Sequence, residues 1–182
     1  MTDEAALEQT HGGTAPAGDG WFVVNTVDAP WLRHDYFGAT SDFEGATRFP
    51  ETGIGIHVLW PGQPNGMYHA ETAQEDFLVV AGECLLLIEG EERPLRAWDF
   101  VHCPSGTEHI FVGAGTGPCV IVMVGARPEG RTIRYPVSEL ARRHGASVEE
   151  ETDTGRKAYA RFPQWESGPM PEGALPSLGT EP

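Results

Sequence analysis

Residues 62–82 read GQPNGMYHAETAQEDFLVVAG, and this stretch carries three potential metal ligands within seven residues. His69 is followed by Glu71 two positions later and by Glu75 four positions after that. Side chains two apart in a strand project from the same face, so His69 and Glu71 are expected to point together. Segment 72–74 is short enough to turn the chain into a second strand that begins at Glu75. The stretch therefore predicts that three ligands converge.

A fourth ligand is expected from residues 97–113, which read AWDFVHCPSGTEHIFVG. Pro104 and Gly106 predict a rigid turn, and the strand after it is expected to carry His109 inward. Imidazole and carboxylate together suit Fe, Mn, Zn, Ni or Cu, and carboxylates shift the preference towards the harder ions. The two stretches predict one divalent metal, most readily Fe, Mn or Zn, on the ligands His69, Glu71, Glu75 and His109.

The chain around these stretches reads as short strands separated by Gly and Pro turns, which is typical of an all-β sandwich or barrel. Ser138 predicts the N-cap of one short helix, and Gly145 its end. We expect one domain over residues 21–166, between a disordered lead (1–20) and a disordered tail (167–182). The expected strands cover residues 21–27, 53–60, 67–71, 75–82, 83–90, 92–98, 99–104, 107–113 and 117–126.

The two stretches resemble the two sequence motifs of the cupin family. The first motif is a Gly, then HxH, then Glu, then Gly, and the second is PxG followed after two residues by His. His69, Glu75 and His109 fall on three of the four metal-binding positions of that pattern. The resemblance covers about residues 50–126 and leaves 127–166 as a C-terminal extension. It implies a cupin-type double-stranded β-helix (jelly-roll) barrel with a short C-terminal helix, and a homodimer.

Three positions depart from the cupin pattern. Glu71 stands where the second His is usual, Trp98 where a Gly opens the second motif, and Gly113 where an Asn is usual. The last two fall at turns and leave the expected fold unchanged. Glu71 is either a fourth ligand or an acid/base group beside a two-His, one-carboxylate site, and its shared face with His69 favours the ligand.

Isolated histidines have a simpler interpretation than metal binding. A lone His on an apolar strand is usually a satisfied core residue, and this applies to His34, His57 and His144. It applies poorly to a set at matching spacing, since several ionisable groups facing one core are costly to bury without a compensating ion. A metal-free barrel in which Glu71 and a His perform acid/base chemistry stays open as an alternative.

Composition excludes several classes of partner. The formal net charge is −15, from 12 Lys and Arg against 27 Asp and Glu, which disfavours nucleic acid and anionic membranes. No apolar run is long enough to span a bilayer, and the acidic start lacks the apolar core of a secretory signal, so a cytoplasmic location is expected. Cys84, Cys103 and Cys119 are expected to be buried thiols.

We expect a small-molecule metalloenzyme of the dioxygenase, isomerase or decarboxylase type. Glu71 and Glu75 are the groups able to move protons. An enclosed barrel excludes polymers, so the substrate is expected to be compact, with an oxygen-donor head and a modest apolar body. The alternative is a cupin module that binds a small ligand or a metal without turnover, and a storage-type role is a more distant third.

Overall fold

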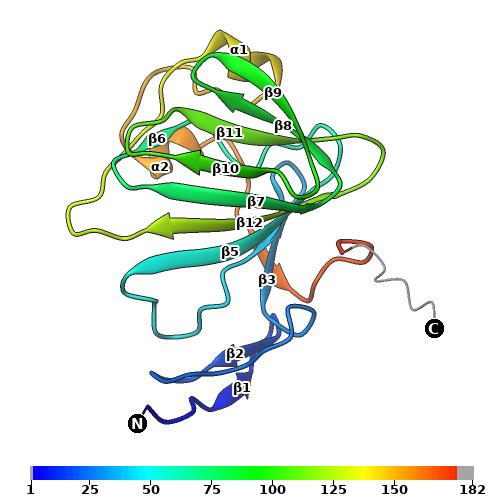
Figure 1. Ribbon diagram of the computed structural model, residues 1–182, viewed down its shortest axis with the longest axis vertical. Coiled ribbons are helices and arrows are strands. Elements are labelled where there is room, and N and C mark those ends of the chain that lie inside the picture. Colours follow the sequence, from blue (N-terminus) through cyan, green and yellow to red (C-terminus); the bar gives the residue numbers. More distant parts are fainter. Residues whose placement is uncertain (1, 176–182) are drawn as a thin grey trace.

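Two facing β-sheets make up most of the structure, a computed structural model that describes residues 2–175 (Figure 1). The larger sheet has the strand order β10-β7-β12-β5-β4-β3-β14, and the smaller has the order β11-β8-β9. The strands are β1 (Leu7–Gln9), β2 (Thr14–Pro16), β3 (Trp31–His34), β4 (Gly38–Ser41), β5 (Thr52–Leu59), β6 (Ala70–Glu71), β7 (Glu75–Ala81), β8 (Glu83–Ile88), β9 (Glu91–Arg96), β10 (Phe100–Cys103), β11 (His109–Ala114), β12 (Cys119–Ala126), β13 (Ile133–Arg134) and β14 (Glu166–Gly168). The helices are α1 (Glu139–Arg143) and α2 (Gly155–Ala158).

The two sheets enclose an apolar core. Alternate residues of β7, β12 and β5 point inward and meet the inner face of β8 and β11, as the period of two in a strand requires. The extended segment 62–69 runs beside β11 and widens the smaller sheet, through bridges from Pro64 to Val112 and from His69 to His109. This is the predicted double-sheet barrel. Its core residues include Leu59, Phe77, Val79, Leu86, Phe111 and Ile121.

The tip of the β8–β9 hairpin illustrates how local sequence determines the turns. Ile88 pairs with Glu91, so only Glu89 and Gly90 connect the two strands. Both have positive φ, 48° and 80°, which is the backbone of a type I′ turn and matches the twist of a hairpin. The sequence Glu89-Gly90-Glu91-Glu92 predicts such a tight hairpin tip with solvated charge, and the structure confirms it.

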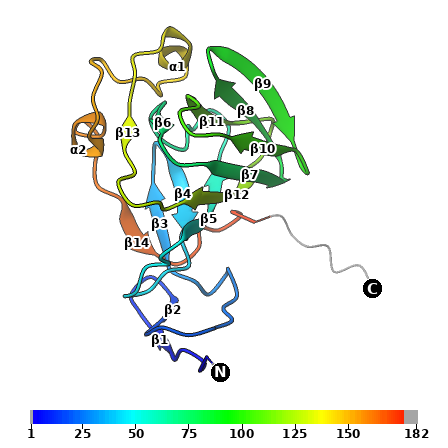
Figure 2. The same ribbon diagram turned by 60° about the vertical axis from the view of Figure 1, so that its left-hand side comes forward.

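The C-terminal extension covers the outer face of the smaller sheet (Figure 2). The Ser138 side chain accepts a hydrogen bond of 3.2 Å from the N–H of Ala141, so the predicted N-cap is confirmed. Leu140 and Ala141 then pack against the outward side chains of this sheet, among them Tyr68 and Ile110. The extension is therefore an integral layer of the fold behind the segment that carries His69.

The structure differs from the expected order at both ends. Strands β1 and β2 pair within the lead expected to be disordered, and the backbone of Pro16 lies against Gly45, where only glycine leaves room. Near the C-terminus β14 pairs with β3, and Ala174 is buried, while residues 176–182 lie outside the described part. Composition indicates low intrinsic order but cannot detect such tertiary contacts. The boundaries of the single domain remain predictions.

Residues 21–27 do not form the first barrel strand. Trp21, Val23 and Val27 are largely exposed, and only Trp21 makes an isolated bridge. The apolar alternation of this segment is that of a strand, but the β3–β4 hairpin occupies the position next to β5. A strand needs a free neighbour as well as the right pattern.

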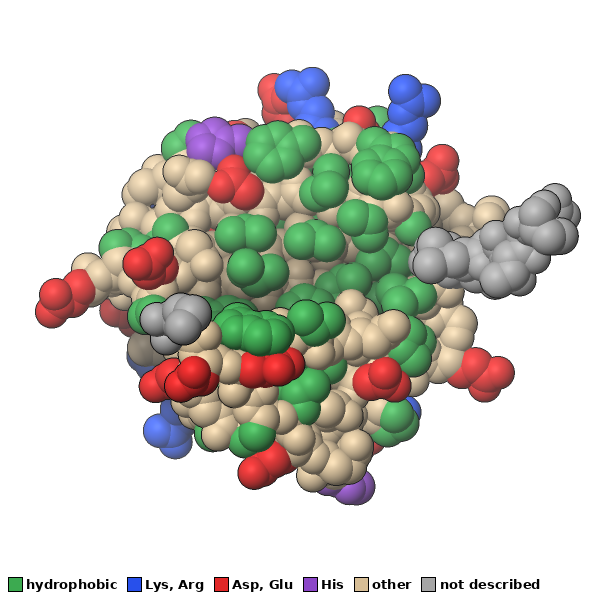
Figure 3. All heavy atoms as spheres, turned by 60° about the horizontal axis from the view of Figure 1, so that its bottom comes forward, with side chains coloured by type: hydrophobic (Ala, Val, Ile, Leu, Met, Phe, Trp, Pro, Cys, Tyr) green, Lys and Arg blue, Asp and Glu red, His purple; other side chains and the backbone are tan. Residues whose placement is uncertain are grey.

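The outward face of the larger sheet is also apolar, and Figure 3 shows such side chains gathered there. Phe100, Leu78, Val122 and Ile56 form one row of direct cross-strand partners on this face. Phe100 is 63% exposed at the edge strand β10. Among the helices of residues 2–175, none is long and apolar enough to cross a membrane.

Candidate metal centre

His69 and His109 lie directly opposite each other on two neighbouring extended segments. The N–H of His69 donates to the carbonyl of His109 at 3.2 Å, and the reverse bond is 2.9 Å. Direct partners of this kind project their side chains to the same face. The two imidazole centroids are accordingly 4.9 Å apart. Backbone pairing therefore brings together two ligands that lie forty positions apart in the sequence.

Both imidazoles have a defined tautomer. Nδ1 of His69 is 2.9 Å from the carbonyl oxygen of Met67, and Nδ1 of His109 is 3.0 Å from that of Thr107. A carbonyl oxygen only accepts hydrogen bonds, so each Nδ1 carries the proton and each Nε2 keeps its lone pair. A metal-ligating His is held in the same way, with its second ring nitrogen donating to a carbonyl.

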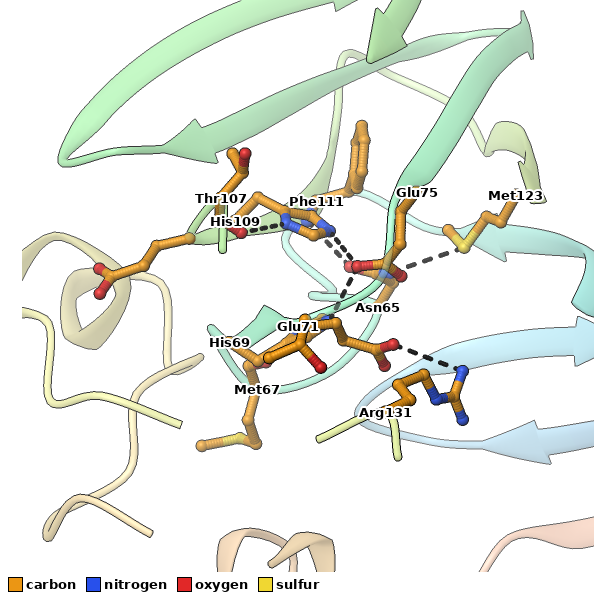
Figure 4. A network of polar contacts seen from close by, with 12 residues as sticks. Asn65, Met67, His69, Glu71, Glu75, Thr107, His109, Phe111, Met123 and Arg131 are labelled. Atoms are coloured by element: carbon orange, nitrogen blue, oxygen red, sulfur yellow. Dashed lines mark hydrogen bonds and ion pairs between the residues drawn. The ribbon is translucent and has the colours of Figure 1, made fainter. Parts of the chain in front are cut away.

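Glu75 approaches the two imidazoles from the opposite sheet. It is the first residue of β7 and pairs with Cys103 of β10 and Gly125 of β12. Its Oε2 lies 3.9 Å from Nε2 of His69 and 3.6 Å from Nε2 of His109 (Figure 4). One donor atom from each residue lies within 4.8 Å of the others. The structure thus brings together three of the four predicted ligands.

Burial controls the protonation of this group. It lowers the pKa of His109 to about 4, with a contribution from the neighbouring His69, whose own pKa burial also lowers. Burial raises the pKa of Glu75 to about 7, and the Glu71 carboxylate adds to the rise while Arg131 opposes it. Desolvation disfavours the charged form of each residue. The imidazoles are therefore neutral at neutral pH, which is the form that binds metals.

Glu71 does not join the group of three. Its Oε2 lies 3.4 Å from Nη1 of Arg131, and Figure 4 shows the two side chains directed at each other. The contact is an ion pair without hydrogen-bond geometry, and Oε2 is a buried atom that accepts no hydrogen bond from the described part of the chain. Burial raises the pKa of Glu71, and Arg131 opposes the rise. The expected fourth ligand is thus directed away from the three-residue group and towards an arginine.

A cavity of about 230 Å³ opens in front of the three residues. Phe77 forms part of its wall, with its ring 5.2 Å from that of His109. Asn65 is fixed at another side, because its Oδ1 accepts a bond of 2.8 Å from the N–H of Phe111. The cavity is lined by Asp42, Gly53, Ile54, Gly55, Asn65, His69, Glu75, Phe77, His109, Met123, Val124, Gly125 and Arg127.

The inward strand phase of the ligands predicts an apolar wall of Met67, Phe77, Val79 and Phe111, and this is largely confirmed. Phe77, Val79 and Phe111 are buried together in the barrel core. Met67 was expected to share their inward phase but packs on the other side with Phe37 and the C-terminal extension. The irregular segment 62–69 joins the sheet only through isolated bridges, so strict strand alternation does not hold before His69.

The structure places three further side chains. Cys103 is buried in the core, whereas His102 faces outward and pairs with Asp76 at 2.6 Å. His57 was expected to be a satisfied core histidine. It is buried, but its Nε2 has no hydrogen-bond partner in the described structure.

The C-terminal extension supports the metal centre from behind. The hydroxyl of Tyr159 accepts a hydrogen bond of 3.0 Å from the N–H of Met67, and the carbonyl of Met67 in turn holds Nδ1 of His69. The ring of Tyr135 lies 5.9 Å from the ring of His69. Sequence reasoning missed this support because nothing in the motif points to residues so far along the chain.

Sequence reasoning also missed Arg127 and Arg131. Arg127 lines the cavity, and Arg131 contacts Glu71. A signal existed, since the chain has only 12 Lys and Arg, and two of them follow closely after the last barrel strand. Arg127 directly follows β12, whereas the proximity of Arg131 to Glu71 depends on the β13–β6 pairing, which returns the chain to Glu71.

The fold agrees with comparisons to known proteins. The cupin domain family matches residues 55–125. A comparison with curated protein sequences gives no match. Residues 55–125 therefore form a cupin domain, and the chain is a cupin-domain protein. The match spans β5 to β12 and includes His69, Glu75 and His109.

Solved structures align with this chain at low sequence identity, and the first of the following three has the same fold. A predicted oxalate decarboxylase from Thermotoga maritima aligns with 19% identity and a TM-score of 0.51, over 59% of this chain and all of that one. A cupin-superfamily sugar phosphate isomerase from Silicibacter pomeroyi aligns with 18% identity and a TM-score of 0.49, over 83% of each chain. A polyketide cyclase from Streptomyces resistomycificus aligns with 14% identity and a TM-score of 0.43, over 48% of this chain. The aligned part spans less than two thirds of the cyclase, 63%.

Proposed function

We propose that the protein is a small-molecule metalloenzyme that holds one divalent transition metal on His69, Glu75 and His109. The observation that carries the proposal is the convergence of two lone-pair nitrogens and one carboxylate in front of a cavity. Two donors bonded to one ion at about 2.1 Å cannot lie more than about 4.2 Å apart. The distances from Glu75 to the two histidines, 3.9 and 3.6 Å, satisfy this limit.

The donor set favours iron, manganese or zinc, with nickel and copper also compatible. Two imidazoles and one carboxylate on one face leave coordination positions open to a substrate. A metal bound there supplies a Lewis acid that polarises an oxygen of the substrate and orients it. The reactions that fit such a centre are those of an isomerase, a decarboxylase or a dioxygenase.

The protein groups around the centre have separate roles. The backbone carbonyls of Met67 and Thr107 hold the two imidazoles in the ligating tautomer. Glu71 is the group able to accept or return a proton, since it lies beside the centre and its raised pKa brings it nearer to neutral pH. Phe77 and Met123 restrict water on the apolar side of the cavity. Acid/base work by Glu71 is thus the role we propose in place of metal ligation.

The size of the cavity limits the substrate. A volume of about 230 Å³ admits a small molecule and excludes a polymer. The centre favours an oxygen-donor head group, and the apolar wall favours a modest apolar body.

Elemental analysis of untagged protein, purified without chelator, tests the proposal. We expect about one equivalent of Fe, Mn or Zn in the wild type, and its loss in a His69→Ala/His109→Ala double variant. His102→Ala is the matched control. The His102 side chain points out of the barrel and pairs with Asp76, so this variant should keep its metal content. If the wild type holds no metal even after reloading, the proposal that the protein is a metalloenzyme is refuted.

The same preparation separates an enzyme from a binding module. The metal found determines the screen: oxygen uptake for iron, and isomerase or lyase substrates for zinc. A metal-loaded protein that binds small molecules without converting any of them would be a non-catalytic cupin module.

A further inference from the structure

Arginines line a hollow beside this cavity, which we call its entrance, in an otherwise acidic protein. A second hollow of about 480 Å³ is lined by Arg48, Phe49, Arg127, Pro128 and Arg131. It adjoins the cavity in front of the metal centre, because Arg127 lines both. Three of the 12 basic residues of a chain with net charge −15 therefore lie at one entrance. Basic side chains are thus concentrated at one place on an acidic protein.

Two of these arginines are already neutralised. Arg127 donates to both carboxylate oxygens of the buried Glu44 and, at 2.8 Å, to the carbonyl of Phe49. Arg48 donates to the same Glu44 at 3.0 Å and also pairs with Asp42 at 3.8 Å. Their guanidinium groups form the wall of the entrance and have a carboxylate partner within the protein.

Arg131 is different. Its backbone is tied down, since the adjacent Thr132 exchanges backbone and hydroxyl hydrogen bonds with Thr72 and Ile133 pairs with Glu71. Its side chain is 42% exposed, and its one ion pair within residues 2–175 is the 3.4 Å contact with Glu71. No hydrogen bond from its guanidinium to residues 2–175 is formed. A planar group with five N–H donors is thus anchored at the entrance with its donors free.

We propose that Arg131 determines the specificity of the site for a small carboxylate, which it binds at the entrance while the rest of the ligand fills the cavity in front of His69, Glu75 and His109. This inference rests on the proposed function, since it names the substrate class of that centre. The guanidinium fork matches the two oxygens of a carboxylate, and one edge stays directed at Glu71. Glu71 thereby orients Arg131.

The neighbouring charges favour a carboxylate over a phosphate ester. Glu71 and Glu75 lie near the ligand position, and their repulsion of a dianion is about twice that of a monoanion. A single free guanidinium offsets one negative charge. Arg48 and Arg127 offset little more, because Glu44 pairs with both and Asp42 pairs with Arg48.

Calorimetric titration of the metal-loaded protein tests the inference. The probes are acetate, butanoate and benzoate, each beside its neutral amide, together with butyl phosphate. We expect the carboxylates to bind at millimolar concentration and the amides to bind about tenfold more weakly or not at all. Arg131→Gln should weaken carboxylate binding about tenfold or more and remove the preference over the amide. Arg131→Lys should retain part of it, because the charge remains and the fork is lost.

Arg134→Gln is the matched control. Arg134 lies three residues away and pairs with Glu108 and Glu151 outside the cavity, so this variant should bind carboxylates like the wild type. Metal content is measured in every sample, which separates the two hypotheses. A metal-loaded wild type that binds no carboxylate, or binds carboxylate and amide equally, overturns the inference and leaves the metalloenzyme intact. So does equal carboxylate binding by Arg131→Gln, or tighter binding of butyl phosphate.

Failure of the metal centre gives a different pattern. If the wild type holds no metal, the proposed function is refuted, and the same titration is run on the metal-free protein. Dependence of carboxylate binding on Arg131 would then support the anion site alone, and its absence would overturn that as well.

Discussion

The metal centre and the entrance of the cavity differ in how their side chains are held. We call His69, Glu75 and His109 the floor of the cavity. On the floor, His69 and His109 are direct strand partners, and a backbone carbonyl holds each Nδ1. At the entrance, Glu71 and Arg131 meet in one ion pair of 3.4 Å without a hydrogen bond. The two imidazoles are held rigidly by the fold, which suits a metal ion with fixed coordination geometry. The Arg131 guanidinium has free N–H donors, which suits a substrate that binds and dissociates.

Replacing the carboxylate on the floor should produce the largest effect. Glu75→Gln removes the one charged ligand that directly faces both histidines. We expect metal affinity to fall at least about 100-fold, more than when a residue behind a ligand is lost. Competition with a chromophoric chelator measures it. An affinity within a few fold of the wild type would show that Glu75 is not a ligand.

His57 is a buried histidine outside the metal centre, and its effect on stability should depend on pH. Burial lowers the pKa of His57 from 6.5 to about 4. Because the folded pKa lies below the unfolded one, His57 contributes no penalty above about pH 6.5 and costs stability as the pH falls towards about 4. The cost at about pH 5 should be about 2 kcal/mol, and His57→Leu should remove it.

Urea unfolding of metal-free wild type and His57→Leu, each at about pH 8 and about pH 5, measures this difference. The other buried histidines titrate in both proteins, so comparing the two isolates His57. Equal losses of stability on acidification would contradict the prediction.

Removing the support behind the floor should have a moderate effect. Tyr159→Phe deletes the hydroxyl that accepts the N–H of Met67 and leaves a buried donor unpaired. We expect a loss of about 1 kcal/mol in unfolding free energy and a loss of about tenfold in metal affinity. Tyr36→Phe is a suitable control, since the Tyr36 hydroxyl bonds Gly145 away from the centre. If Tyr159→Phe loses stability but keeps its metal affinity, then Tyr159 stabilises the fold without affecting the metal centre.

The smallest effect on the metal is expected at the entrance. Glu71→Gln should change metal affinity less than about threefold, because Glu71 faces Arg131 and not the three-residue group. Turnover, once a substrate is known, should fall, since the amide cannot take up a proton. A loss of metal comparable to that in Glu75→Gln would return Glu71 to the ligand set. Chelator competition on both variants provides the measurement.

The sequence predicted the barrel and the floor well because both depend on local patterns. Gly and Pro mark the turns, and strand alternation predicts which side chains point inward. The sequence spacing of His69, Glu75 and His109 correctly predicted that these three side chains meet. The entrance was not predictable in this way. Strand phase aligned Glu71 with His69 but could not indicate that Arg131, sixty positions later, returns beside it.

Tertiary contacts also explain the other misses. The β1–β2 hairpin forms in a segment whose composition predicts disorder, and residues 21–27 have the pattern of a strand but no vacant neighbour. Tyr159 supports His69 through the backbone of Met67, a contact between segments with no shared motif. Each of these depends on which surfaces meet, which a pattern along one chain does not encode.

The direct pairing of His69 with His109 ties the chemistry of the site to the alignment of two strands. A slip of one residue between segment 62–69 and β11 would turn one imidazole to the opposite side of the sheet relative to the other. Of the observed alignment and those shifted by one residue, only the observed one places both imidazoles on the same face. Metal binding would then indicate that the smaller sheet has folded in the correct register. An ion that binds during folding would stabilise this register relative to the shifted ones.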